Sequence, residues 1–234
     1  MRNIPVTLGI ACSSRNASFS GKAGPGLTAE IKQKIFERDD YVCQCCGFRS
    51  KKYQDIHFIN ENPKDIRPDN MATTCIFCHQ CFQLDKVAEM RSGVLIWLPE
   101  IEQADLHHIA RAVYVARISQ GPIADAARHI LEILMQRRNE VRARLGTDDP
   151  ALLTMVMRDY ISAQTYEHRK AKLDGIRLFP LDRRIIKEAD LEFNQFPQIL
   201  AYYRSKDGPF GGKLPKDWVE IYRNALSGKT GQAA

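Results

Sequence analysis

Apolar residues recur along this chain with two spacings, and the spacing changes near residue 100. Before that point they alternate over residues 53–59 and form an unbroken run over residues 94–98, which ends at Pro99. Both patterns indicate strands. One helix is expected over residues 28–39, because Ile31 and Ile35 share a helical face and Thr28 is a typical N-cap.

Two further elements are expected in the first hundred residues. Residues 4–11 predict a first strand, and a linker rich in Ser, Gly and Pro follows it. Asp69 and Asn70 are residue types that cap helices, so they predict a helix that carries the second of two cysteine pairs.

After residue 100 the apolar spacing becomes helical. Leu106, Ile109, Ala110 and Val113 illustrate it, and Gly146 is a typical helix end. A short extended piece is expected at residues 175–181. The expected helices span residues 101–119, 122–146, 149–162, 183–204 with a break near Pro197, and 216–226.

These elements predict an α+β protein. A small cysteine-bearing module is expected at residues 28–100 and a mostly helical extension at residues 101–226. Residues 1–27 are expected to form an N-terminal strand and linker, and residues 227–234 a flexible tail.

The composition favours a soluble globular protein, with 44% hydrophobic and 26% charged residues among 234. No segment approaches the roughly 20 apolar residues of a membrane span, so direct membrane insertion is not expected. The apolar run near the N-terminus is shorter than a signal core, and Pro5 interrupts it. We therefore expect a cytoplasmic protein, in which clustered cysteines indicate a metal more often than disulfides.

Two Cys-x-x-Cys pairs carry the strongest chemical signal. Cys43 and Cys46 form the first pair, and Cys75 and Cys78 form the second. Such a spacing lets one tight turn direct two sulfurs at one ion, and four thiolates suit structural Zn²⁺. The alternative is a set of cysteines buried without a metal.

Two further cysteines and one glycine lie beside these pairs. Gly47 supplies the backbone freedom that the turn after the first pair needs. Cys45 and Cys81 are extra, and each is either a substitute ligand or a small core residue.

Charge argues against a nucleic-acid partner. The net charge is +6, but residues 28–91 contain ten Lys/Arg and ten Asp/Glu, so the cysteine module is formally neutral. A nucleic-acid-binding module usually has a basic working face. The basic run of residues 137–144 is more typical of a solvated helix face.

The module resembles HNH (ββα-metal) endonucleases that carry a four-cysteine zinc site. The resemblance implies that His57 is the general base, that Asn70 holds the loop and that His79 completes a divalent-metal site. Ile56 stands where the family has a metal-binding residue. Asp55 is one step away in the expected strand, so we expect its side chain on the other face.

A longer stretch resembles the DotN (IcmJ) family of Dot/Icm type IVB secretion subunits, most densely over residues 33–109. The segments "QKIFERDDYVCQCCGFRSKKYQDI", "TTCIFCHQCF" and "VLIWLPEIEQADLHHI" carry the resemblance. It implies a zinc-bearing, HNH-like domain with added helices that binds the C-terminal extension of the coupling ATPase DotL. It also implies IcmS/IcmW-like adaptors in the same complex, at the inner-membrane face.

We therefore predict a non-catalytic structural component of a secretion coupling complex. The alternatives are a metal-dependent HNH endonuclease and a zinc-module nucleic-acid binder without cleavage. Cys45 and His57 depart from the secretion-subunit pattern, which keeps the enzyme alternative open. Apolar residues that could meet a partner are residues 94–98, Tyr202, Tyr203 and Trp218, unless they fill the core.

Overall fold

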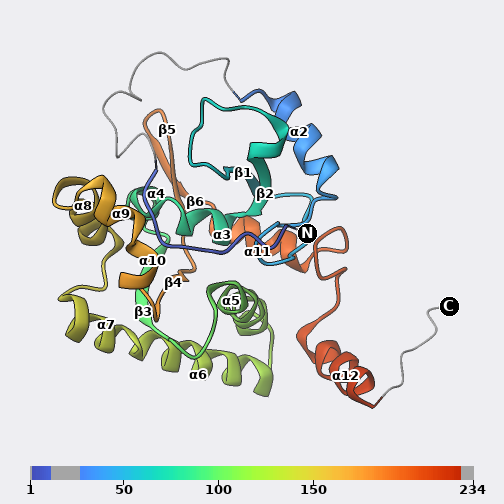
Figure 1. Ribbon diagram of the computed structural model, residues 1–234. Coiled ribbons are helices and arrows are strands. Elements are labelled where there is room, and N and C mark those ends of the chain that lie inside the picture. Colours follow the sequence, from blue (N-terminus) through green and yellow to red (C-terminus); the bar gives the residue numbers. More distant parts are fainter. Residues whose placement is uncertain (1, 12–26, 228–234) are drawn as a thin grey trace.

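The computed structural model describes residues 2–11 and 27–227 and confirms the α+β class (Figure 1). Within these residues the strands form three separate two-stranded antiparallel sheets. The predicted strand over residues 4–11 is wrong. This segment is extended, but it only makes scattered backbone bonds, such as Ile4 N to Gln44 O (2.9 Å) and Gly9 N to Cys81 O (2.8 Å). Most of the predicted linker and most of the predicted tail lie outside the described residues.

The cysteine module contains two strands and a helix in the order β1, β2, α3. The prediction that residues 69–70 cap the second cysteine helix is wrong. Asn70 ends a 3₁₀ turn, a strand rich in β-branched residues follows, and Cys75 is the N-cap of α3. The elements are α2 (Ala29–Arg38), β1 (Gln54–Phe58), η2 (Pro68–Asn70), β2 (Met71–Cys75) and α3 (Ile76–Cys81).

The second sheet joins segments that are about eighty residues apart in the sequence. Strand β3 (Gly93–Trp97) pairs with β4 (Ile176–Pro180), with Leu95 opposite Leu178. Both segments were predicted to be extended, and both are almost wholly buried. Gly175 has φ +79° and lies against the Trp97 ring, where a side chain would clash.

Helices pack beside this second sheet, among them α5, α7 and α8 (Figure 1). The helix predicted over residues 122–146 is two helices, which meet at Arg137, and the second ends at Gly146 in the left-handed conformation (φ 75°). The helices outside the cysteine module are α4 (Leu84–Met90), α5 (Gln103–Arg117), α6 (Pro122–Gln136), α7 (Arg138–Leu145), α8 (Pro150–Asp159), α9 (Ala163–Glu167), α10 (Arg169–Lys172), α11 (Phe196–Arg204) and α12 (Pro215–Leu226).

The helix predicted over residues 183–204 is wrong in its first half. Residues 185–194 form a hairpin of β5 (Ile185–Glu188) and β6 (Leu191–Asn194), whose turn contains Ala189 at φ 52°. Pro197 lies in the first turn of α11, where a missing N–H is tolerated, so it begins the helix instead of breaking it.

One core cluster combines the cysteine module with the helical part. It contains Phe48 and Phe77 from the module, together with Tyr114 of α5 and Tyr203 of α11. The division at residue 100 stays a prediction. In the described part of the chain, none of the helices has both the length and the apolar character that a bilayer crossing requires.

Candidate metal centre and the neighbouring histidine pocket

The structure brings the four predicted cysteines together. The sulfurs of Cys43, Cys46, Cys75 and Cys78 all lie within 4.8 Å of one another. The first pair lies on the loop after α2, where Gly47 adopts φ 74°, and the second pair lies at the start of α3. Three of the four residues are fully buried, and Cys46 is half-buried.

The donor set fits a tetrahedral zinc ion. With Zn–S bonds of about 2.3 Å, the sulfurs of a tetrahedral site lie about 3.8 Å apart. The sulfurs of Cys46 and Cys75 are 3.7 Å apart. Cys45 and Cys81 are both buried and lie outside the four-sulfur cluster. The cluster can therefore bind a metal ion, and its composition favours Zn²⁺.

A buried arginine from α5 contacts the cluster. The Nη2 of Arg111 donates to the Cys75 sulfur at 2.7 Å. Its guanidinium lies 4.0 Å from the Phe48 ring centroid and 4.9 Å from that of Phe77. Burial opposes its charge, but the nearby sulfurs, Cys75 foremost, outweigh burial and raise the pKa of Arg111 above its ordinary value. Arg111 therefore offsets part of the negative charge that thiolate ligands bring.

A histidine one helical turn earlier contacts a second sulfur. Gln103 Oε1 accepts from the backbone N–H of Leu178, so its amide nitrogen faces His107 Nε2 at 2.8 Å. His107 Nε2 must then accept, which leaves the proton on Nδ1, 3.2 Å from the Cys78 sulfur. Burial lowers the pKa of His107 well below its ordinary value, in keeping with a neutral ring that donates to Cys78.

The sequence analysis missed these α5 residues. Gln103, His107 and Arg111 lie at spacings of four, so they share one helical face, and all three are buried. The sequence did contain a signal for these residues. The three polar residues lie on the same helical face as core residues such as Leu106 and Ala110. Buried polar groups need partners, and here the partners are the thiolates and β4.

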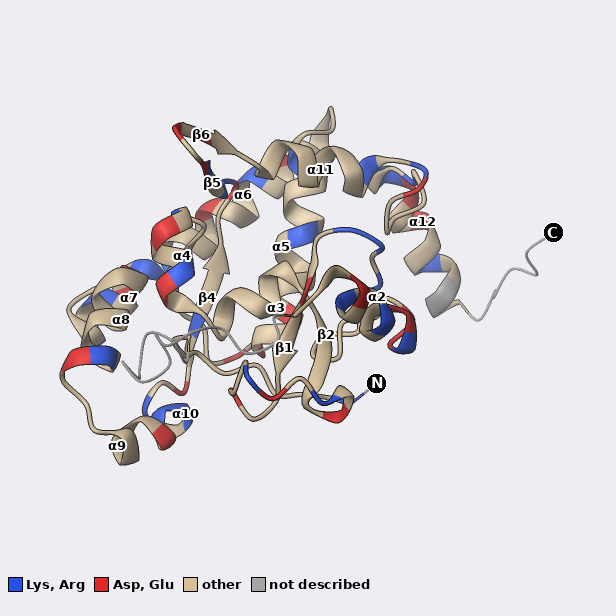
Figure 2. Cartoon of the chain, turned by 90° about the horizontal axis from the view of Figure 1, so that it is seen from above, with Lys and Arg blue, Asp and Glu red and all other residues tan. Residues whose placement is uncertain are grey.

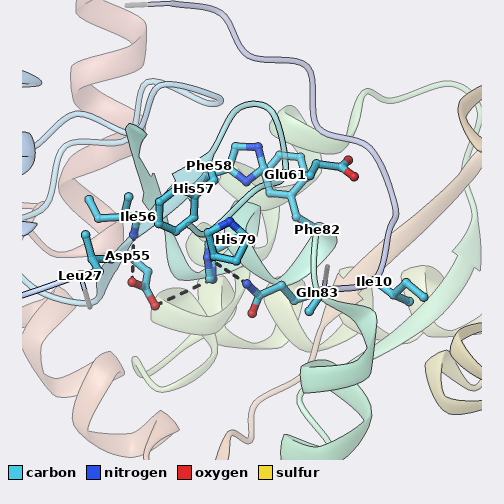
Figure 3. Close-up of a pocket in the computed structure, with 12 residues that line it drawn as sticks. Ile10, Leu27, Asp55, Ile56, His57, Phe58, Glu61, His79, Phe82 and Gln83 are labelled. Carbon is cyan, nitrogen blue, oxygen red and sulfur yellow. Dashed lines mark hydrogen bonds and ion pairs between the residues drawn. The ribbon is translucent and has the colours of Figure 1, made fainter. Parts of the chain in front are cut away.

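Asp55 and the two histidines of the HNH resemblance, His57 and His79, line a separate cavity of about 280 Å³ (Figure 3). His57 stacks on Phe82 with ring centroids 3.9 Å apart and an 18° angle between planes. Burial, with a smaller effect of His79, lowers the pKa of His57 to about 3. His57 is therefore a weak base at neutral pH.

Asp55 and Ile56 point to opposite faces of the strand, as predicted, and the face of Asp55 is the one that carries this pocket. Its Oδ2 is 4.0 Å from His79 Nδ1, and its Oδ1 accepts from Lys32 Nζ at 3.0 Å. Alternate strand residues share a face, so Asp55 and His57 point together. Ile56 points the other way and packs in the cluster that contains Ile35.

Asn70 holds the long loop between β1 and β2. Its Oδ1 accepts from Asn60 N at 2.9 Å, and its Nδ2 donates to Asp65 O at 2.8 Å. This is the loop-holding role that the HNH resemblance implies.

The predicted partner-facing residues are mostly core. Leu95, Ile96 and Tyr203 are buried, and Arg144 covers the half-buried Trp97 ring at 3.9 Å. Figure 2 shows both signs of charge close together on α2 and the loops around it, as the neutral charge count of the module predicts. In the basic run, Arg138 and Arg142 both pair with Asp148.

No family model matches the chain. A curated relative, the Type 4 apparatus protein DotN of Legionella pneumophila, is 33% identical over 163 residues, which cover 68% of this chain and 76% of the relative. The chain therefore belongs to the DotN family of type 4 secretion apparatus proteins.

Proposed function

We propose that this chain is a zinc-stabilised, non-catalytic structural component of a type IVB secretion coupling complex. The observation that carries the proposal is the attachment of α5 to the thiolate cluster through Arg111 and His107. All four ligand positions are supplied by sulfur, which leaves none for a substrate. A metal held in this way joins the cysteine module to the helical part of the chain.

Cys43, Cys46, Cys75 and Cys78 are the proposed zinc ligands. Metal analysis of the purified protein should give about one zinc per chain, since a four-thiolate site closes around one ion. Chelation should then unfold the module, because metal binding and folding are coupled in such sites. Stoichiometric iron or no metal at all would contradict the assignment.

One observation favours the endonuclease alternative. Asp55, His57 and His79 all line one cavity, so a carboxylate is available beside both imidazoles. Three features oppose catalysis. Lys32 already pairs with Asp55, Phe82 covers one face of the His57 ring, and a base with a pKa of about 3 is far from the optimum near neutral pH. Plasmid nicking with Mg²⁺, Mn²⁺ or Ni²⁺ that disappears in His57→Ala would establish the alternative.

The proposed partner is the C-terminal extension of the coupling ATPase, with IcmS/IcmW-like adaptors in the same complex. We expect no nucleic-acid partner. Family membership supports a place in the apparatus. This complex would hold the protein on the cytoplasmic side of the inner membrane. Co-purification of the chain with the tagged ATPase extension tests the proposal, and absence of binding between the two purified components would contradict it.

A further inference from the structure

A fifth cysteine lies against the four-sulfur cluster without belonging to it. Cys45 is buried in the same core cluster as the proposed ligands Cys43 and Cys78. Its thiol hydrogen-bonds to the sulfurs of both residues. A thiolate has no proton to donate, so Cys45 is the donor and Cys43 the acceptor when Cys43 binds a metal. Cys45 therefore stands beside two of the four proposed ligand positions.

Cys46 is the proposed ligand that is least protected from solvent. The other three, Cys43, Cys75 and Cys78, are fully buried, whereas Cys46 is half-buried. The carbonyl oxygen of Cys46 accepts from Nε2 of His108, an exposed side chain, at 2.7 Å. A small thiol reagent that approaches the cluster therefore meets Cys46 first, because reactivity of a cysteine requires access to it.

Cys45 and Cys46 are neighbours on one tight turn whose two ends are fixed. Gly47 N donates to Cys43 O at 2.9 Å, and Cys43 N donates to Phe48 O at 2.9 Å. Adjacent Cα atoms are about 3.8 Å apart, so Cys45 can replace Cys46 at a metal by a movement inside this turn. Gly47, at φ 74°, supplies the backbone freedom for such a movement.

We propose that Cys45 is a reserve ligand, which takes the position of Cys46 when Cys46 is lost or chemically modified. This inference rests on the proposed zinc site and adds a fifth residue to its ligand set. Cys45 releases its proton to solvent as it binds, since the metal binds the thiolate. Four sulfurs then still surround the site, and the hydrogen bonds from α5 to the two sulfurs of the second pair are preserved.

X-ray absorption at the zinc edge of the full-length protein tests the inference, because Zn–S bonds of about 2.3 Å are distinguishable from Zn–O bonds of about 2.0–2.2 Å. Cys46→Ala should keep its zinc with four sulfur neighbours. Cys45→Ala/Cys46→Ala should show three sulfurs and an oxygen, or no bound zinc. In competition with a chelator, its zinc affinity should be at least about tenfold lower than that of Cys46→Ala.

Cys46→Ala/Cys81→Ala is the matched control, because it also removes a second buried cysteine near the centre. The Cys81 sulfur lies 3.7 Å from His107 Nε2 and 3.6 Å from Phe77 O. The control should therefore keep the four sulfur neighbours of Cys46→Ala. Circular dichroism of each variant reports whether the fold is kept.

The outcomes separate the reserve ligand from the zinc site itself. A fourth sulfur that persists in Cys46→Ala and in the control, but disappears when Cys45 is also replaced, supports the reserve ligand. If Cys46→Ala loses its zinc or its fourth sulfur, the reserve ligand is overturned while the zinc site of the wild type stands. A fourth sulfur that survives in Cys45→Ala/Cys46→Ala, or is lost in the control, overturns it equally. If the wild-type chain binds no zinc, both proposals fail.

Discussion

Replacing Arg111 with Met tests whether α5 is part of the metal centre. Met is close in length and unbranched, so it can fill the space between Phe48 and Phe77 without the charge. Arg111 is 1% exposed, so water cannot replace the lost hydrogen bond to Cys75. The substitution therefore removes mainly the electrostatic contact with the sulfurs.

The size of the effect follows from the geometry. Four thiolates and one Zn²⁺ have a net charge of −2, or about −0.5 on each sulfur. At the observed 2.7 Å, a unit charge and half a charge interact by about 3 kcal/mol with an effective dielectric constant near 20. Breaking a buried ion pair costs about 3–5 kcal/mol, a similar value. We expect a loss of about 3 kcal/mol, or roughly a hundredfold in zinc affinity.

Competition for zinc with a coloured chelator measures this loss, and urea unfolding of the zinc-loaded protein measures the matching change in stability. Arg144→Met is the control, because Arg144 lies over the Trp97 ring and pairs with Glu140 at the surface. It should change stability by less than about 1 kcal/mol and leave zinc affinity unaltered. If Arg111→Met binds zinc as tightly as the wild type, the thiolate–guanidinium contact contributes nothing and the reasoning is wrong.

Three further predictions concern individual side chains. Cys75→Ser should lose zinc and most helical circular dichroism, whereas Cys45→Ser should keep one zinc per chain, because Cys45 lies outside the sulfur cluster. Gln103→Leu should lower the free energy of unfolding by about 1–3 kcal/mol in urea, since it leaves buried groups of His107 and Leu178 without partners. The pKa of His57 in the folded protein is about 3, below its ordinary value of 6.5. Between these two pH values the unfolded state binds more protons than the folded state, so the free energy of unfolding falls as the pH drops below 6.5. His57→Phe should remove this pH-dependent contribution to the free energy of unfolding, which amounts to at most about 1.4 kcal/mol per pH unit. If the pH profile of unfolding is the same in the variant and the wild type, the burial argument is contradicted.

Local chemistry was predictable from the sequence, and long-range pairing was not. The cysteine cluster followed from two spacings of three residues and one glycine, all of which act within single turns. The contact between Arg111 and Cys75 spans 36 positions and depends on how α5 packs against the module. No periodicity of one segment contains that information, although three polar residues on a buried helical face showed that partners exist.

The errors have physical causes too. Residues 185–194 contain too few apolar positions to separate a short hairpin from a helix, and the turn at Ala189 carries no Gly or Asn–Gly signal. The expectation for Asp55 compared it only with Ile56, which does point to the opposite face. Comparison with His57, two residues further on, places the carboxylate and the imidazole on one face of β1.

The cysteine cluster and helix α11 are connected through one aromatic contact. Tyr203 of α11 packs edge-on against Phe48 at 5.6 Å, and Phe48 follows the first cysteine pair. Leu200 stands within one turn of Tyr203 on the same helix, and both are buried in the core cluster that contains Phe48. A metal ion at the four cysteines would hold the loop that carries Phe48, and through Phe48 it would support the packing of α11.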